Sequence, residues 1–142
     1  MAFHLTGVHH CSIMVSDMNR AASFYREVLG LTEIPTPSTF PAAGLRVRWF
    51  DVGNEQVHLM PGGPDKVSPR HFAVHVEDAK AAREHFKSKQ VEVRETTPIP
   101  GADRFFISDP DGNNIEVIEW FQQWPSGDSN PILPPIVDAE NA

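Results

Sequence analysis

The stretch His10-Cys-Ser-Ile-Met-Val-Ser-Asp17 returns in altered form as His71-Phe-Ala-Val-His-Val-Glu-Asp78. When the second stretch is moved back by 61 positions, the leading histidines and the closing aspartates coincide. Further along the chain the offset becomes 58, which pairs His58 with Glu116. Two copies of one pattern in this order indicate an internal duplication.

Each copy reads as a strand, a helix and three shorter strands. In the first run of each copy, successive side chains are of the kinds expected on opposite faces of a β-strand. Asp17 and Asp78 follow these runs, at positions where they can cap the amino end of the next helix. We therefore predict an α+β fold of two βαβββ modules. The expected strands are 8–15, 31–34, 45–52 and 56–60 in the first module and 71–76, 91–95, 104–108 and 114–120 in the second.

The length of 142 residues suits one compact domain. We expect this domain to span residues 1–122, with module one at 5–60 and module two at 69–122. Proline and glycine interrupt the chain between them, so 61–68 is expected to be a linker. Residues 123–142 are rich in proline and are expected to form an extended or disordered tail.

Charge and composition exclude several classes of function. With 19 acidic against 12 basic residues the net charge is −7, which disfavours binding to nucleic acid. No apolar run approaches the roughly 20 residues that span a bilayer, so no membrane association is expected. Cys11 is the only cysteine, which excludes an internal disulfide and a multi-cysteine zinc site. A cytoplasmic location is the resulting expectation.

Strand alternation predicts which polar residues can meet. It places His10 and His71 on the face turned away from the helix of each module, together with His58 and Glu116. If the two helix-free faces cover each other, these four side chains line a cleft between the sheets. Imidazole nitrogens and a carboxylate match the ligand set of zinc, nickel, cobalt, manganese or iron.

The arginines of the strands give candidate substrate ligands. Arg46 and Arg48 alternate with apolar neighbours and are predicted to face the cleft, and Arg104 has the equivalent parity. The offset of 58 places Arg48 on Phe106. Guanidinium groups there would bind a carboxylate, a phosphate or a glutathione-like anion, whereas the alternative is that they are solvent-exposed strand residues. His75 is also predicted to line the cleft.

Four motifs together resemble the vicinal oxygen chelate superfamily, which includes glyoxalase I, methylmalonyl-CoA epimerase, fosfomycin-resistance thiol transferases, extradiol dioxygenases and bleomycin-resistance proteins. The motifs are residues 10–17, 22–30, 71–78 and 106–116, and the resemblance covers about residues 5 to 122. The resemblance implies that two curved mixed sheets enclose a cleft, and that the cleft binds one divalent metal ion. The implied metal ligands are His10, His71 and Glu116, with His58 at the fourth position.

The resemblance also implies a function. We expect a glyoxalase-like lyase or isomerase that chelates vicinal oxygens of a small, anionic substrate, with a homodimer as the assembly. Glu116 is expected to be a ligand or to move a proton, and His58 to be a ligand or an acid/base partner. Phe106, a predicted substrate contact, stands where fosfomycin enzymes and extradiol dioxygenases have a tyrosine. The alternatives are an iron extradiol-type dioxygenase, a thiol transferase, and a non-catalytic protein that sequesters a drug or metabolite.

Overall fold

The computed structural model describes most of the region predicted to fold. The described residues are 4, 6–40, 47–63, 69–122, 130–132 and 134. Arg46, the start of the predicted strand 45–52, part of the predicted linker and most of the predicted tail lie outside them.

Module one contains a four-stranded sheet in the order β1-β4-β3-β2. Strand β1 is parallel to β4, and the other neighbouring pairs are antiparallel. The elements follow the predicted order, with the helix continuing as a π-helical segment. They are β1 (His10–Val15), α1 (Met18–Ser23), η1 (Phe24–Val28), β2 (Thr32–Ile34), β3 (Arg48–Val52) and β4 (Glu55–Pro61).

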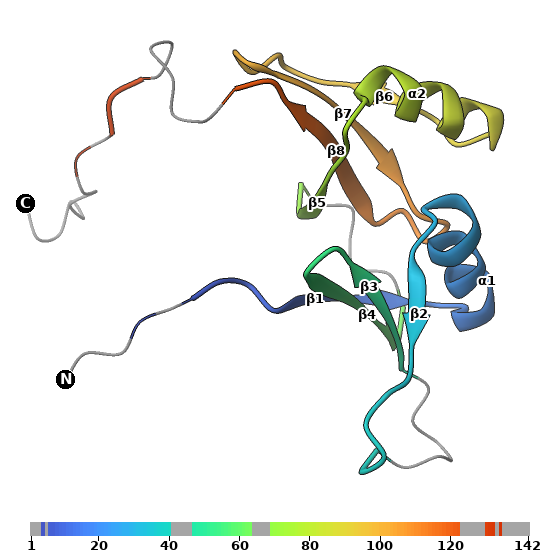
Figure 1. The fold of residues 1–142 in the computed structure, drawn as a ribbon. Coiled ribbons are helices and arrows are strands. Elements are labelled where there is room, and N and C mark those ends of the chain that lie inside the picture. Colours follow the sequence, from blue (N-terminus) through green and yellow to red (C-terminus); the bar gives the residue numbers. More distant parts are fainter. Residues whose placement is uncertain are drawn as a thin grey trace, which may run out of the picture.

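Module two repeats this arrangement with the order β5-β8-β7-β6 (Figure 1). The outer strand β6 is shorter than the predicted 91–95, because only two of its residues pair with β7. The elements are β5 (His71–His75), α2 (Ala79–Ser88), β6 (Arg94–Glu95), β7 (Ala102–Ser108) and β8 (Asn114–Trp120). The predicted α+β fold of two βαβββ modules is therefore confirmed.

Both helices begin at the predicted aspartates. The Oδ1 atom of Asp17 accepts a hydrogen bond of 3.0 Å from the backbone N–H of Arg20, and Oδ1 of Asp78 accepts one of 2.9 Å from that of Ala81. These bonds satisfy amide groups that have no partner within the helix. The first helical segment is followed by Gly30 at φ 74°, a conformation that glycine adopts without strain.

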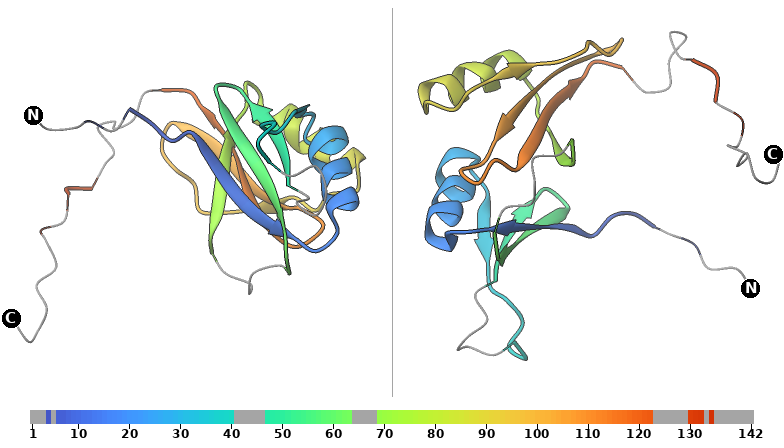
Figure 2. Two further views of the ribbon diagram at one scale, coloured as in Figure 1. Left: turned by 90° about the horizontal axis from the view of Figure 1, so that it is seen from below. Right: turned by 180° about the vertical axis from the view of Figure 1, so that it is seen from behind.

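The hydrophobic core lies between each sheet and its helix, and both helices lie at the same end of the molecule (Figure 2). Alternate strand residues point into this core, as the sequence predicted. The fully or almost fully buried strand residues are Val15, Phe50, Val57, Leu59, Phe105, Ile107, Ile115 and Val117. The opposite side of each sheet, called here the helix-free face, carries the polar candidates.

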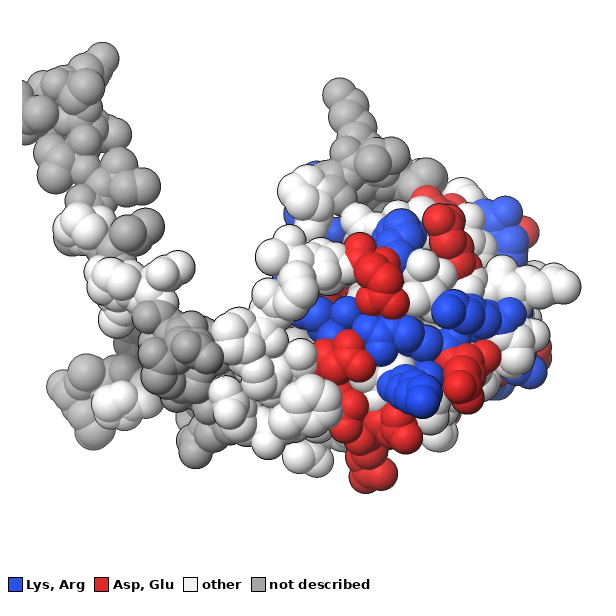
Figure 3. Space-filling view, turned by 90° about the horizontal axis from the view of Figure 1, so that it is seen from above, with Lys and Arg blue, Asp and Glu red and all other residues white. Residues whose placement is uncertain are grey.

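Charges of both signs alternate on the surface above α2 and its neighbouring strands (Figure 3). This face therefore has no extended basic patch of the kind that neutralises phosphates of nucleic acid. No helix within the described ranges is long and apolar enough to cross a membrane.

Candidate functional site

Module one contributes a pair of histidines to its helix-free face. His10 is exposed on the edge strand β1, whereas His58 on β4 is only 6% exposed. Their rings stack with centroids 4.0 Å apart and 19° between the planes. The Nδ1 atoms of His9 and His10 lie 2.8 Å apart and share a hydrogen bond.

His58 is held on three sides. The indole of Trp49 stacks on the face that His10 leaves open, and Nε2 of His58 hydrogen-bonds to Oε1 of Gln56 at 2.8 Å. Burial, with His10 and His9 nearby, lowers the pKa of His58. His58 is therefore neutral near pH 7, which is the form that binds a metal ion.

Module two contributes the equivalent pair. Nε2 of His71 on β5 lies 3.1 Å from Oε2 of Glu116 on β8, and Glu116 is 8% exposed. Its other oxygen, Oε1, accepts a hydrogen bond of 3.2 Å from Nη1 of Arg104. The ring of Phe106 contacts His71 edge-on, with centroids 4.9 Å apart. Each module thus supplies an exposed histidine from its first strand and a buried partner from its last.

The polar contacts of His71 fit a bound cation. Its Nδ1 lies 2.9 Å from the carbonyl oxygen of Pro69, which can only accept, so Nδ1 carries the hydrogen. In the neutral ring, the lone pair of Nε2 then faces a carboxylate oxygen of Glu116. A proton or a metal ion between these two acceptors removes the repulsion. Two ligands that each lie about 2.1 Å from one ion are roughly 3 Å apart, close to the observed separation.

The four predicted ligands form two pairs on two sheets. Within the described ranges, no three His, Cys, Asp or Glu side chains lie close enough to hold a metal ion together. The binding of one ion by His10, His58, His71 and Glu116 therefore stays a prediction.

A family model described as the Glyoxalase/Bleomycin resistance protein/Dioxygenase superfamily matches residues 7–117. The chain belongs to this superfamily. Its curated relatives include the uncharacterized protein YwbC of Bacillus subtilis (strain 168), 32% identical over 127 residues, covering 82% of this chain and 97% of YwbC. The mitochondrial methylmalonyl-CoA epimerase of Bos taurus is 27% identical over 105 residues, covering 64% of this chain and 58% of the epimerase.

Solved structures of the superfamily have the same fold. A protein from Bacillus anthracis described as glyoxalase family superposes with a TM-score of 0.75 at 28% identity, covering 84% of this chain and 99% of the other. A mutant of the fosfomycin resistance protein FosX of Listeria monocytogenes, complexed with Mn(II) and 1S,2S-dihydroxypropylphosphonic acid, gives 0.69 at 18% identity, covering 80% and 92%. At that identity the second likeness shows the fold alone.

The register of the strands corrects the predicted orientation of Arg48. Arg48 lies opposite Leu59 on the helix side of its sheet, where its guanidinium donates to both carboxylate oxygens of Glu33, at 2.7 and 3.1 Å. It does not face His58, and the residue that does is Trp49. The prediction that Arg48 points to the helix-free face is therefore wrong.

The physical reason is that the apolar neighbour of Arg48, Trp49, does not belong to the core: Trp49 lies on the helix-free face, and Phe50 is the residue of β3 that is buried. The pairing of Arg48 with Phe106 was wrong for a second reason, a turn that is longer in module two. Trp49 lies opposite His58, and Phe106 lies opposite Glu116. The offset between the modules is therefore 116 − 58 = 58 for the last strand but 106 − 49 = 57 for the strand before it. A register difference of one residue turns a side chain to the other face. The counterpart of Phe106 is thus Trp49, and the pairing of Phe106 with Arg48 is corrected.

Of the other predicted substrate residues, Arg104 and His75 have defined positions. Arg104 lies opposite Ile118 and so shares the face of Glu116, but Nε and Nη2 both donate to the carbonyl oxygen of Thr97, at 3.1 and 2.7 Å. His75 is exposed on β5, and its Nε2 accepts a bond of 3.4 Å from the backbone N–H of Trp120. Arg46 lies outside the described residues. The substrate roles of these residues stay predictions.

Two residues on the helix-free faces were missed by the sequence reasoning. Trp49 was assigned no role, although its alternation with Phe50 could have placed it beside His58. Arg94 was also overlooked, although it follows the alternating Val91 and Val93, which pack at the edge of the core. The alternation places the side chain of Arg94 on the face of the sheet opposite to the one that carries these valines.

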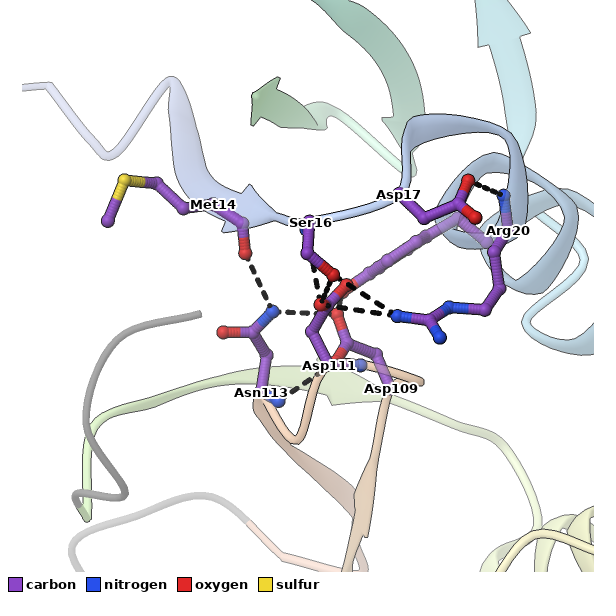
Figure 4. A network of polar contacts seen from close by, with 8 residues as sticks. Met14, Ser16, Asp17, Arg20, Asp109, Asp111 and Asn113 are labelled. Atoms are coloured by element: carbon purple, nitrogen blue, oxygen red, sulfur yellow. Dashed lines mark hydrogen bonds and ion pairs between the residues drawn. The ribbon is translucent and has the colours of Figure 1, made fainter. Parts of the chain in front are cut away.

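A polar junction joins the end of β1 to the turn between β7 and β8 (Figure 4). Oδ1 of Asp111 accepts hydrogen bonds from the backbone N–H and the hydroxyl of Ser16, and Nδ2 of Asn113 donates to the carbonyl oxygen of Met14 at 3.1 Å. The buried hydroxyl of Tyr25 donates to Oδ2 of Asp109 at 3.0 Å. The bonds of Ser16 and Met14 connect the end of the strand that carries His10 to the hairpin that carries Glu116, and the bond of Tyr25 connects η1 to the same hairpin.

Proposed function

We propose that this chain is a metal-dependent lyase or isomerase of glyoxalase type that acts on a small, anionic substrate with adjacent oxygen atoms. One divalent ion, of zinc, nickel, cobalt, manganese or iron, would be held by His10, His58, His71 and Glu116. The observation that carries the proposal is the approach of Nε2 of His71 to Oε2 of Glu116 at 3.1 Å, with Nδ1 of His71 committed to Pro69.

A bound divalent ion would supply Lewis-acid stabilisation of an anionic oxygen such as an enediolate. The chain's own residues would move the proton. One carboxylate oxygen of Glu116 accepts a hydrogen bond from Arg104, and the other oxygen faces His71. His58 is neutral and stacked between two rings, so it suits a fixed ligand, and acid/base work is its alternative role.

The superfamily supports this class of chemistry. Its members similar to this chain include the methylmalonyl-CoA epimerase of Bos taurus, and the Agrobacterium tumefaciens lactoylglutathione lyase has a TM-score of 0.65 at 20% identity. A related FosX structure contains Mn(II). The iron dioxygenase and thiol transferase alternatives receive less support, because Phe106 offers no hydroxyl at the position where those relatives have tyrosine.

A second candidate is a non-catalytic binding protein for an apolar compound. The neighbouring methionines Met14 and Met60 share the helix-free face of module one and are 41% and 40% exposed. Flexible methionine side chains suit the binding of varied apolar molecules. This candidate requires neither histidine pair.

Metal analysis of the purified protein tests the proposal. We expect near-stoichiometric metal in the wild type and its loss in His10→Ala, His71→Ala and Glu116→Ala. His85→Ala is a matched control, because this exposed histidine lies on α2 and bonds to the backbone oxygen of Val28. A wild-type protein without metal after reconstitution with each candidate ion would refute the enzyme and leave the binding protein.

The same variants identify which chains supply the two pairs. We propose a homodimer, as the resemblance implies. If one ion takes its ligands from two chains, a mixed dimer of His10→Ala and Glu116→Ala recovers about half of the sites. If both pairs belong to one chain, the mixture binds no more metal than the separate variants.

A further inference from the structure

Arg94 lies on the same face as the second ligand pair. On strand β6 it stands directly opposite Phe106 of β7, and Phe106 stands opposite Glu116 of β8. Directly opposed residues of neighbouring strands project to the same side of a sheet. Arg94 therefore occupies the outer edge of the helix-free face of module two.

The guanidinium of Arg94 contacts only neutral acceptors among the described residues. It donates to the hydroxyl of Ser108 at 2.7 Å, to Oδ1 of Asn114 at 2.9 Å and to the carbonyl oxygen of Ile107 at 3.4 Å. These bonds use three of its five N–H groups. By contrast, Arg48 and Arg104 each form an ion pair with a carboxylate. The positive charge of Arg94 has no such counterion in the described part of the chain.

Arg94 is one of the residues that line a cavity of about 300 Å³. Phe24, Val91 and Pro110 give it apolar walls, and Ser108 and Gln90 add polar groups. Its volume is at the lower end for small-molecule sites. Glu92 also lines the cavity and is its one exposed acidic residue, whereas the buried Asp109 is engaged by Tyr25 and the amides of its own turn.

The bonds of Arg94 also direct it toward the ligand pair. Asn114, which accepts one of them, lies directly opposite His71 in the register of β5 and β8. We propose that Arg94 binds the anionic group, a carboxylate or a phosphate, of the substrate whose adjacent oxygens reach the metal site. This assignment of the anion to the substrate rests on the proposed function. Two free N–H groups on a partly buried arginine would give charge-assisted bonds to such a group.

Binding of simple anions to the full-length, metal-free protein tests the proposal. Inorganic phosphate and acetate are titrated separately, and the amide resonances of Ser108 and Asn114 and the Nε–H of Arg94 are followed by NMR. We expect saturable shifts with at least one anion, and the stronger of the two identifies the group. Arg94→Gln should weaken binding by about tenfold or more, the usual effect of losing a charged hydrogen-bond partner.

Two further variants make the test specific. Arg48→Gln is the matched control, and it should bind the anion as the wild type does, because Arg48 is neutralised by Glu33 on the other face. Glu92→Gln removes the repelling charge in the cavity and should tighten binding severalfold. This variant keeps Arg94 in place, so it also tests the proposal if Arg94→Gln does not fold.

Unchanged affinity in folded Arg94→Gln, no tightening in Glu92→Gln, or no response of the wild type would each overturn the proposal. Measuring the metal content of the same proteins distinguishes a failure of the anion proposal from a failure of the proposed metal-dependent function. Arg94→Gln should keep its metal while losing the anion. A wild type that binds anions at Arg94 but no metal would refute the enzyme and retain the anion site.

Discussion

The indole of Trp49 lies flat against the imidazole of His58, with ring centroids 3.9 Å apart and 3° between the planes. The stack comes from directly opposed residues of β3 and β4, so the backbone register itself sets it. With Gln56 on Nε2, it fixes the orientation of His58 before any ion arrives. Supporting contacts of this kind commonly change metal affinity when they are removed.

We therefore expect Trp49→Ala to weaken metal binding by about tenfold, within the range seen for outer contacts of metal ligands. Trp49→Phe should retain most of the affinity, because a flat ring still supports His58. Competition with a chromophoric chelator measures both. Equal affinity of Trp49→Ala and the wild type would show that His58 needs no support or is not a ligand.

Removal of the buried hydroxyl that links the modules should lower stability. In Tyr25→Phe, Oδ2 of Asp109 loses the bond from Tyr25 but keeps the one from Nδ2 of Asn113. We expect the free energy of unfolding in urea to fall by about 1 to 2 kcal/mol. Tyr25→Ala also opens a cavity in the core and should cost roughly 3 to 5 kcal/mol. Similar losses in the two variants would contradict a separate contribution of the hydroxyl.

The sequence was sufficient to predict the fold and the faces of the ligand-bearing strands. His10 and His71 open strands whose other face is apolar, so alternation alone settled their side. His58 and Glu116 followed from the same rule. The repeat was visible because both modules keep a histidine and a helix-capping aspartate at matched positions.

The sequence could not predict features that depend on register between strands. Arg48 was misplaced because its apolar neighbour Trp49 suggested a core residue, whereas Trp49 stacks on His58 and Phe50 is the buried residue. Its pairing with Phe106 failed because one extra residue in the turn before β8 changes the offset, and a pattern of residue types does not reveal a single insertion. Whether an arginine has a counterion also depends on residues that are distant in the sequence. Arg48 is neutralised by Glu33, 15 positions away, while Arg94 is left with neutral partners.

The ion pair of Asp103 should make stability depend on pH. Nη1 and Nη2 of Arg83 donate to the two oxygens of Asp103 at 2.8 and 2.6 Å, and this holds the pKa of Asp103 below its usual value. The carboxylate therefore stabilises the fold above its unfolded pKa of about 3.9, and this contribution is lost as pH falls through the lower folded pKa.

We accordingly expect Asp103→Asn to cost about 1 kcal/mol near pH 7, a modest value because the carboxylate is partly exposed to water. The difference from wild type should shrink as pH falls below about 4. Urea unfolding at several pH values measures it. Glu95→Gln, which removes the more exposed partner of Arg83, should have a smaller effect. A difference that grows toward acid would reverse the assigned sign.

The single thiol should react slowly. Burial raises the pKa of Cys11 above its usual value, so less thiolate is present at a given pH. We expect alkylation by iodoacetamide at about pH 8 to be several times slower than in the denatured chain, and to keep rising at higher pH. Equal rates in the folded and denatured protein would show that the thiol is not shielded.

The bond between Tyr25 and Asp109 spans 84 positions of the chain, and this separation orders events during synthesis. Tyr25 belongs to the first helical segment, which leaves the ribosome long before the hairpin of Asp109. Until that hairpin arrives, a hydroxyl that is fully enclosed in the finished molecule lacks its protein acceptor, and it can be satisfied only by water. This buried contact of module one is therefore completed only after module two has been translated, which makes the two modules interdependent despite the duplicated plan.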